Sequence, residues 1–191
     1  MFRSNRRNVL SVIVVVGLAL TSGCTTTGAA SDPAARRASI NASVDLALEE
    51  LFRQVQGSRD LVNQARGVLV FPDVLRAGFM VGASRGQGAL RVGGATRSYH
   101  STTSGSFGIQ AGAQSSAVFL LFMTGEALER FQNSSGWQIG ADASVTLVSV
   151  GANATISTAT AQQPVIGFVL SNRGLMAGVS MDGTRIGRLD L

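Results

Sequence analysis

Glycine recurs within or beside the short apolar runs that make up most of the chain after Gly67. A glycine inside a strand is typical of a bulge, a barrel corner or a close approach of another backbone. Turn signals separate the runs at Gly93-Gly94, Asn172–Gly174 and Asp182-Gly183. Many short strands with frequent glycine indicate a curved antiparallel barrel or sandwich. The expected strands are Gly67–Phe71, Gly78–Ser84, Ala89–Val92, Ser106–Ala113, Ala117–Met123, Trp137–Val150, Val165–Ser171 and Leu175–Met181.

Helical periodicity precedes these strands. Apolar residues from Ile40 to Val55 fall on one stripe, which either packs on the sheet or lies on a membrane. Because the polar face of this helix is acidic, packing on the sheet is favoured. The fold predicted from these patterns is α+β, with N-terminal helices packed on a glycine-rich antiparallel β-barrel or sandwich. The expected helix boundaries are Ser39 as N-cap and Gly57 as stop for the first helix, Ser58–Ala65 capped by Ser58 for the second, and Glu126–Gln132 capped by Thr124 for the third.

The first 23 residues have the features of a secretory signal. Three arginines precede the uncharged apolar run Val9–Leu20, and small residues follow it. The run is shorter than the roughly 20 residues that a membrane-spanning helix needs. We therefore expect residues 1–23 to be a signal peptide that is removed.

The lone cysteine follows directly after these small residues. Thr21-Ser22-Gly23-Cys24 resembles a lipobox, in which the cysteine thiol takes a diacylglycerol group and becomes the new N-terminus. The alternative is an ordinary signal peptide followed by a chance cysteine. Residues 24–37 are expected to form a flexible tether behind lipidated Cys24, and residues 38–191 the domain. The residue after the cysteine is Thr25 rather than Asp, which favours sorting of the lipoprotein to the outer membrane, where the protein faces the periplasm.

Charge is distributed unevenly along the chain. Of the 16 basic residues, three lie in the signal, which leaves 13 against 11 acidic residues, so the composition does not indicate a nucleic-acid-binding protein. No acidic residue occurs from Val74 to Gly125. Arginines in this stretch are candidates for binding lipid-headgroup phosphates, or are strand-edge residues that keep the sheet soluble. They are Arg76, Arg85, Arg91 and Arg97.

Four ordered blocks resemble the SYLF family. Gly67–Phe79 resembles the opening signature, and Gly82–Leu90 continues it. Ser106–Gln114, Gly140–Asp142 and Asn172–Ser180 resemble the later blocks. The resemblance implies a lipid-binding domain, since eukaryotic members associate with phosphoinositide membranes and some with actin. For a bacterial envelope protein it implies lipid binding without the actin role.

Catalytic chemistry finds little support in the residues. His100 is the only histidine, so a Ser-His-Asp set would need it together with Ser101 or Ser104. We instead expect these polar residues to form a solvated turn. One histidine and one lipidated cysteine do not supply a histidine–cysteine metal site, and no cofactor is expected.

These observations predict a membrane-anchored envelope lipoprotein with a non-enzymatic domain that binds membrane lipids, anionic phospholipid among them. The alternative is a structural or protein-interaction module of the cell envelope. An apolar cavity with an arginine at its mouth would favour lipid binding, whereas an exposed edge strand without a cavity would favour the alternative.

Overall fold

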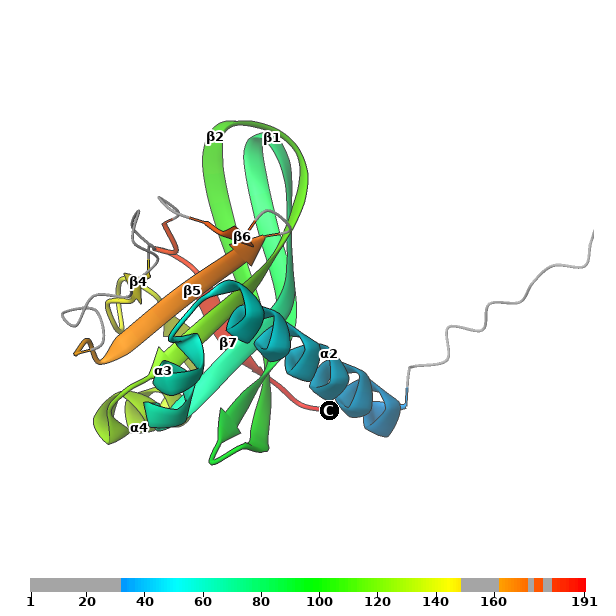
Figure 1. The fold of residues 1–191 in the computed structure, drawn as a ribbon. Helices are drawn as coiled ribbons and strands as arrows, with labels where there is room; N and C mark the ends of the chain where they lie inside the picture. Colours follow the sequence, from blue (N-terminus) through cyan, green and yellow to red (C-terminus); the bar gives the residue numbers. More distant parts are fainter. Residues whose placement is uncertain (1–31, 149–161, 172–173, 177–179) are drawn as a thin grey trace, which may run out of the picture. The chain divides into compact units, whose positions relative to one another are not determined.

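A computed structural model describes residues 32–148, 162–171, 174–176 and 180–191, without the side chains of 78–81 and 106–113. Residues Pro33–Leu191 form one compact unit in which three helices pack on one seven-stranded sheet (Figure 1). The predicted α+β class is confirmed. The barrel and sandwich are both wrong, because the described strands form one open, curled sheet. Its strand order runs β3-β7-β2-β5-β4, with β1 beside β2 and β6 beside β5.

Two long strands form the centre of this sheet. β1 (Gly67–Val92) and β2 (Ala95–Phe122) pair antiparallel along their length through a two-residue turn. The turn was predicted correctly: Gly93 and Gly94 have φ angles of 59° and 81°, as a type I′ hairpin requires. Five of the expected short strands therefore merge into two long ones. Pro72-Asp73, which directly follows the expected strand Gly67–Phe71, lies inside β1 at a register shift between Phe71 and Val74, because a bulge tolerates a residue without an N–H.

The two halves of β1 cross at very close range. A Cβ on Gly88 would lie 1.9 Å from the carbonyl oxygen of Val70, and one on Gly86 would lie 2.8 Å from that of Asp73. No side chain fits between backbones at this distance, so the crossing requires glycine on the later half of the strand. The crossing accounts for the strong curl of the β1–β2 hairpin (Figure 1).

Each half of β2 has a different second partner. Tyr99–Thr103 pair with β7 (Arg185–Leu189), and Ala117–Phe122 pair with β5 (Val165–Ser171). The predicted turn around His100 is therefore wrong, because these polar residues lie inside β2 between two strands. The remaining short strands are β3 (Gly136–Gln138) beside β7, β4 (Thr146–Leu147) parallel to β5, and β6 (Gly174–Leu175) beside β5.

Two of the predicted strands are shorter than expected. Trp137–Val150 gives only β3 and β4, because the chain turns at Gly140, where φ is 91°, and Asp142 accepts a hydrogen bond from the Gln138 N–H. Its last two residues lie outside the described part. Leu175–Met181 contributes only Leu175 to a described strand, and 177–179 are also outside that part. β7 was not predicted, since its polar and apolar residues alternate over only five positions.

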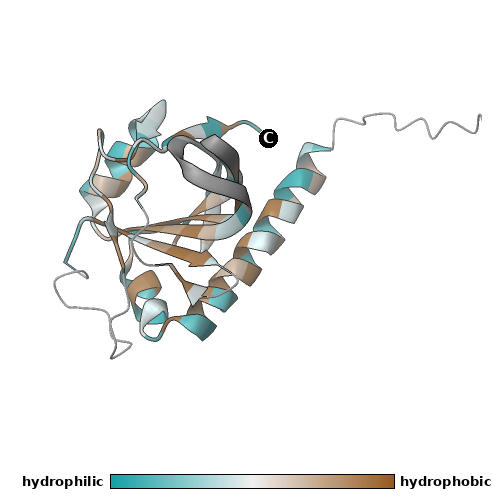
Figure 2. Cartoon of the chain, turned by 90° about the horizontal axis from the view of Figure 1, so that it is seen from above, coloured by the Kyte–Doolittle hydropathy of each residue, from teal (hydrophilic) through white to brown (hydrophobic). Residues whose placement is uncertain are grey.

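The first helix, α2 (Pro33–Gln54), begins six residues before the predicted N-cap Ser39 and includes residues assigned to the tether. Its predicted stripe is buried, with Val44 and Leu51 fully inaccessible, so packing on the sheet is confirmed. Figure 2 shows the helix along the flank of largely apolar strands. Gly57, with φ of 81°, follows the helix end as predicted.

The other two helices test the predicted caps. In α3 (Ser58–Gln64) the Ser58 side chain is not the cap, because its hydroxyl donates to the carbonyls of Leu51 and Val55 at 3.2 and 2.6 Å. In α4 (Gly125–Asn133) the Thr124 cap is confirmed, since its hydroxyl oxygen accepts from the Ala127 N–H at 3.2 Å.

Both faces of the sheet are covered. α2 and α3 pack on one face against Phe119, Leu121 and Phe168, and α4 packs on the other beside Leu120 and Phe122. Adjacent strand residues point to opposite faces. The central strands are therefore continuous apolar runs rather than alternating ones.

The crossing of β1 yields the first prediction. Gly88→Ala should destabilise the fold by about 3 kcal/mol, because the added methyl overlaps the Val70 carbonyl and one of the two backbones must move. Gly105→Ala is the matched control on β2: nothing lies within 4 Å of its Cβ position, so the change should stay within about 0.5 kcal/mol. Urea unfolding measures both, and equal stabilities would show that the crossing imposes no constraint.

Candidate functional site

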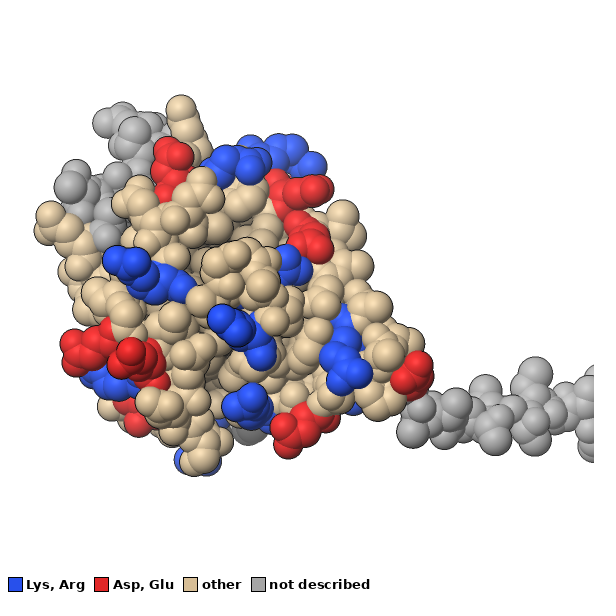
Figure 3. Space-filling view, turned by 90° about the horizontal axis from the view of Figure 1, so that it is seen from below, with Lys and Arg blue, Asp and Glu red and all other residues tan. Residues whose placement is uncertain are grey.

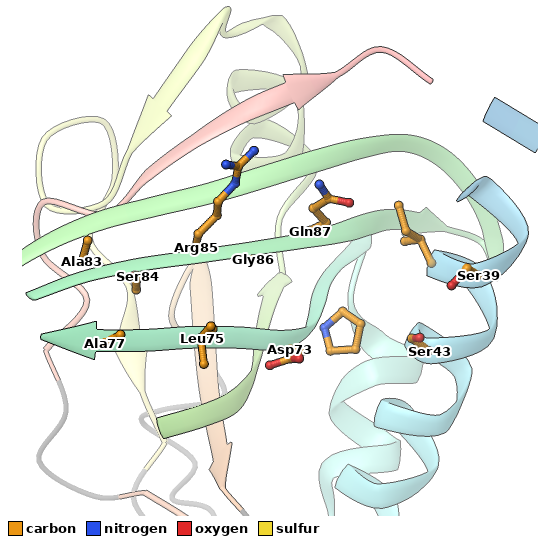
Figure 4. Close-up of a pocket in the computed structure, with 12 residues that line it drawn as sticks. Ser39, Ser43, Asp73, Leu75, Ala77, Ala83, Ser84, Arg85, Gly86 and Gln87 are labelled. Atoms are coloured by element: carbon orange, nitrogen blue, oxygen red, sulfur yellow. The ribbon is translucent and has the colours of Figure 1, made fainter. Parts of the chain in front are cut away.

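A groove runs along one flank of α2 where β1 opens beyond its crossing. Its volume is about 520 Å³, and Leu75 on its wall is 52% exposed (Figure 4). Arg85 extends from the later half of β1, away from the half that carries Leu75 and Asp73. The groove thus has an apolar wall, and the strand that carries Arg85 borders it while the guanidinium points away from Leu75. Its lining is Ser39, Ile40 and Ser43 from α2, with Pro72, Asp73, Leu75, Ala77 and residues 83–87 from β1.

A second hollow of about 420 Å³ adjoins the first and shares Ser43, Pro72 and Asp73 with it. Leu46 of α2 lines this hollow and is 67% exposed. Among the described residues, Leu46 and Leu75 are the two large apolar side chains that are exposed, and both belong to this continuous depression, which we call the α2 groove. The sequence offered one signal for it, since Leu46 lies off the buried stripe of its helix.

The four arginines singled out in the sequence are not brought together. Arg85 lines the α2 groove, whereas Arg76 lies between the groove residues Leu75 and Ala77 and so points to the opposite face of β1. Arg97 lines a different pocket, beside α4. Figure 3 shows the basic residues of one face as separate spots with acidic residues among them.

The fourth arginine holds α2 in place. Arg91 donates from Nη2 to the Asp45 carboxylate at 2.8 Å and to the Asn41 carbonyl at 3.4 Å. The Asn41 side chain accepts from the Thr96 hydroxyl at 2.9 Å and donates to the Tyr99 hydroxyl at 3.0 Å. Arg91 and Asn41 therefore attach the helix that forms one wall of the groove to the hairpin that forms the other.

His100 is buried on the α4 face of β2. Its Nε2 lies 2.8 Å from the Ser98 hydroxyl, and its ring centroid is 5.0 Å from that of Phe131. Burial, followed by the positive charge of Arg188, lowers the pKa of His100 to about 4, and a backbone hydrogen bond with Gly187 opposes the shift. The imidazole is neutral at pH 7 and is partnered by Ser98 rather than by Ser101 or Ser104.

Cys24 and the predicted signal lie outside the described residues, so the anchor stays a prediction. Among the described helices, none is long and apolar enough to cross a membrane. The same residues contain no group of three or more His, Cys, Asp or Glu side chains able to hold a metal ion.

Comparison with known families matches residues 103–189 to the model described as Ysc84, Las17-binding protein actin regulator. This confirms the SYLF resemblance. The SYLF match covers the later part of β2, α4 and the strands that follow, whereas α2 and β1, which form most of the α2 groove, precede it. No curated protein matches the chain.

The buried histidine predicts a pH dependence of folding. An unfolded chain binds a proton on histidine near pH 6.5, but the folded protein does so only near pH 4. The unfolded state therefore binds more protons between these values, and stability falls by about 2–3 kcal/mol as pH drops from about 6.5 to about 4.

Replacing His100→Gln should remove this part of the pH dependence. The measurement is urea unfolding of both proteins from pH 7.5 to 4. The difference between their free energies of unfolding is followed with pH, so that the effects of the carboxylates cancel. Parallel curves for the two proteins would contradict the assigned role of His100.

Proposed function

We propose that this protein is a membrane-anchored envelope lipoprotein whose SYLF domain binds lipid without catalysing a reaction. The observation that carries the proposal is the α2 groove. Both exposed large apolar side chains of the described chain line it, and Arg85 stands on its border. The groove is open and partly apolar, and its exposed leucines favour an acyl chain as the occupant, with an arginine on the strand that borders it.

The groove suits the two parts of a phospholipid separately. Leu46, Leu75 and Ile40 offer apolar contact to an acyl chain, and removing apolar surface from water contributes about 25 cal/mol per Å². Arg85 offers a planar, charged donor to a headgroup phosphate. No hydrolytic step is needed for either contact.

A protein partner is the second candidate. Asp73 and Glu50 also line the α2 groove, and carboxylates there disfavour a densely anionic surface. The family model is described by Las17 binding and actin regulation, which are contacts with proteins. An apolar groove bordered by both signs of charge fits an amphipathic protein segment as well as a lipid.

The anchor is the second part of the proposal. Its support is the run Thr21-Ser22-Gly23-Cys24 after a charged and apolar leader. Lipid on Cys24 would hold the domain at the periplasmic face of the outer membrane, where the α2 groove can exchange lipid with the bilayer. Membrane lipids, anionic phospholipid among them, are the proposed partners.

The groove is tested by vesicle flotation of residues 33–191, which lack the anchor. Leu46→Ser/Leu75→Ser should weaken binding about tenfold at both low and high salt, because each serine removes apolar contact. Arg85→Gln should weaken binding only to phosphatidylglycerol vesicles at low salt, because salt screens an exposed charge. Arg130→Gln removes an equal charge from α4, outside the groove, and should have no effect.

Thermal melts check that each variant is folded. Flotation unchanged by the double leucine variant would remove the α2 groove from lipid binding. Capture of a protein through the same leucines, without vesicle binding, would favour the second candidate.

The anchor is tested on the full chain. Cys24→Ser should abolish incorporation of labelled palmitate and move the protein from the membrane fraction to the soluble fraction, since this thiol is the acceptor in a lipobox. Thr25→Ser, the neighbouring conservative change, should leave labelling intact. Palmitate labelling of the Cys24→Ser protein would contradict the assignment.

A further inference from the structure

Another pocket, separate from both hollows of the α2 groove, lies on the α4 side of the sheet. It has a volume of about 400 Å³ and opens between β2, β7 and the end of α4. Among the described residues that line it, none is acidic. Its polar lining consists of Arg97, Ser98, His100, Gln132, Ser134 and Arg188, which we call the basic pocket.

A β-bulge places Arg97 in this pocket. Leu90 pairs with Ser98, but the next β1 residue, Arg91, pairs with Thr96, so Arg97 is the extra residue of β2. A bulge re-aims the side chain of its extra residue out of strict alternation. Arg97 thereby joins Ser98 and His100 in one pocket, although strict alternation would place its side chain on the face opposite theirs.

Register places the second arginine. Arg188 of β7 is the direct pairing partner of His100 in β2, so the two side chains stand on the same face of the sheet. Ile186, two positions earlier, is buried in the core on this face. The sequence did not indicate Arg188, because β7 itself was not predicted.

The positive charge of the pocket is not neutralised by its surroundings. Within the part of the chain that the structure describes, the ion pairs involve Arg53, Arg91 and Arg130, and neither pocket arginine takes part in one. His100 adds no charge at neutral pH, because burial and, second to it, the charge of Arg188 lower its pKa. The C-terminal end of α4 offers only a partial negative charge.

We propose that the basic pocket binds a phosphate-type oxyanion, a phosphomonoester or phosphodiester group. The two guanidinium groups supply charge-assisted donors, and Ser98, Ser134 and Gln132 supply hydroxyl and amide donors around them. The site goes beyond the proposed lipid groove, because the two lie on different faces of the sheet and share no lining residue. The phosphate belongs to a lipid headgroup or to a small soluble phosphate ester.

The lone histidine of the chain provides a direct measurement. The full chain, produced without a histidine tag and held in nonionic detergent micelles, gives one set of imidazole resonances by NMR. Inorganic phosphate or glycerol 3-phosphate should shift these resonances and raise the pKa of His100, because the anion offsets Arg188. The single tryptophan, Trp137, whose ring centroid lies 5.4 Å from that of Phe131, gives a second signal by fluorescence.

Arg97→Gln/Arg188→Gln should weaken phosphate binding about tenfold or more, as loss of charge-assisted bonds predicts. Arg53→Gln/Arg130→Gln removes the same charge from exposed helix positions and should bind like wild type. Leu75→Ser should also bind phosphate normally, which separates a failure of this pocket from a failure of the α2 groove.

Micelles doped with phosphatidylglycerol or phosphatidylcholine distinguish the two sources. A headgroup ligand should shift the His100 resonances in doped micelles, and this shift should disappear in the double arginine variant. A soluble ester should shift His100 only when added free. The proposal is overturned if no phosphate compound moves the wild-type resonances at up to about 10 mM, or if the double variant binds as tightly as wild type.

Discussion

The close crossing of the two halves of β1 is the constraint on which the rest of the structure depends. Gly88 leaves no room for a Cβ above the Val70 carbonyl, so the strand folds back on itself at backbone distance. Beyond the crossing the two halves diverge, and the strand segments that carry Leu75 and Arg85 form one wall of the α2 groove. The curl therefore produces the groove from a single hairpin, without a closed barrel.

The sequence predicted elements where local chemistry alone decides them. The stripe of α2, the Gly93-Gly94 turn and the Thr124 cap depend on periodicity, positive φ and one hydroxyl. The continuity of β1 was missed because Pro72 is an ordinary strand breaker, whereas here a bulge accommodates it. The start of α2 was missed because Asp32-Pro33 was assigned to the polar tether, although proline is common at the first helical position.

The candidate sites were less predictable than the fold, because their charges have partners from distant segments. An acid-free stretch of sequence suggested four unpaired arginines, but Asp45 of α2 pairs with Arg91 across the hairpin. A one-residue register shift decides where Arg97 points, and pairing with β7 brings in Arg188. These are consequences of tertiary register, which composition and spacing along one strand do not contain.

Register also connects the crossing to the basic pocket. Gly88, His100 and Arg188 occupy successive positions across β1, β2 and β7. The missing side chain at Gly88 lets the Val70 backbone of the first half of β1 approach this end of the row, while the Phe131 ring packs beside His100 from α4. His100 is buried and neutral. Arg188, at the next position of the row, is exposed and carries a positive charge. Since burial keeps His100 neutral, the positive charge of this pocket comes from the arginines.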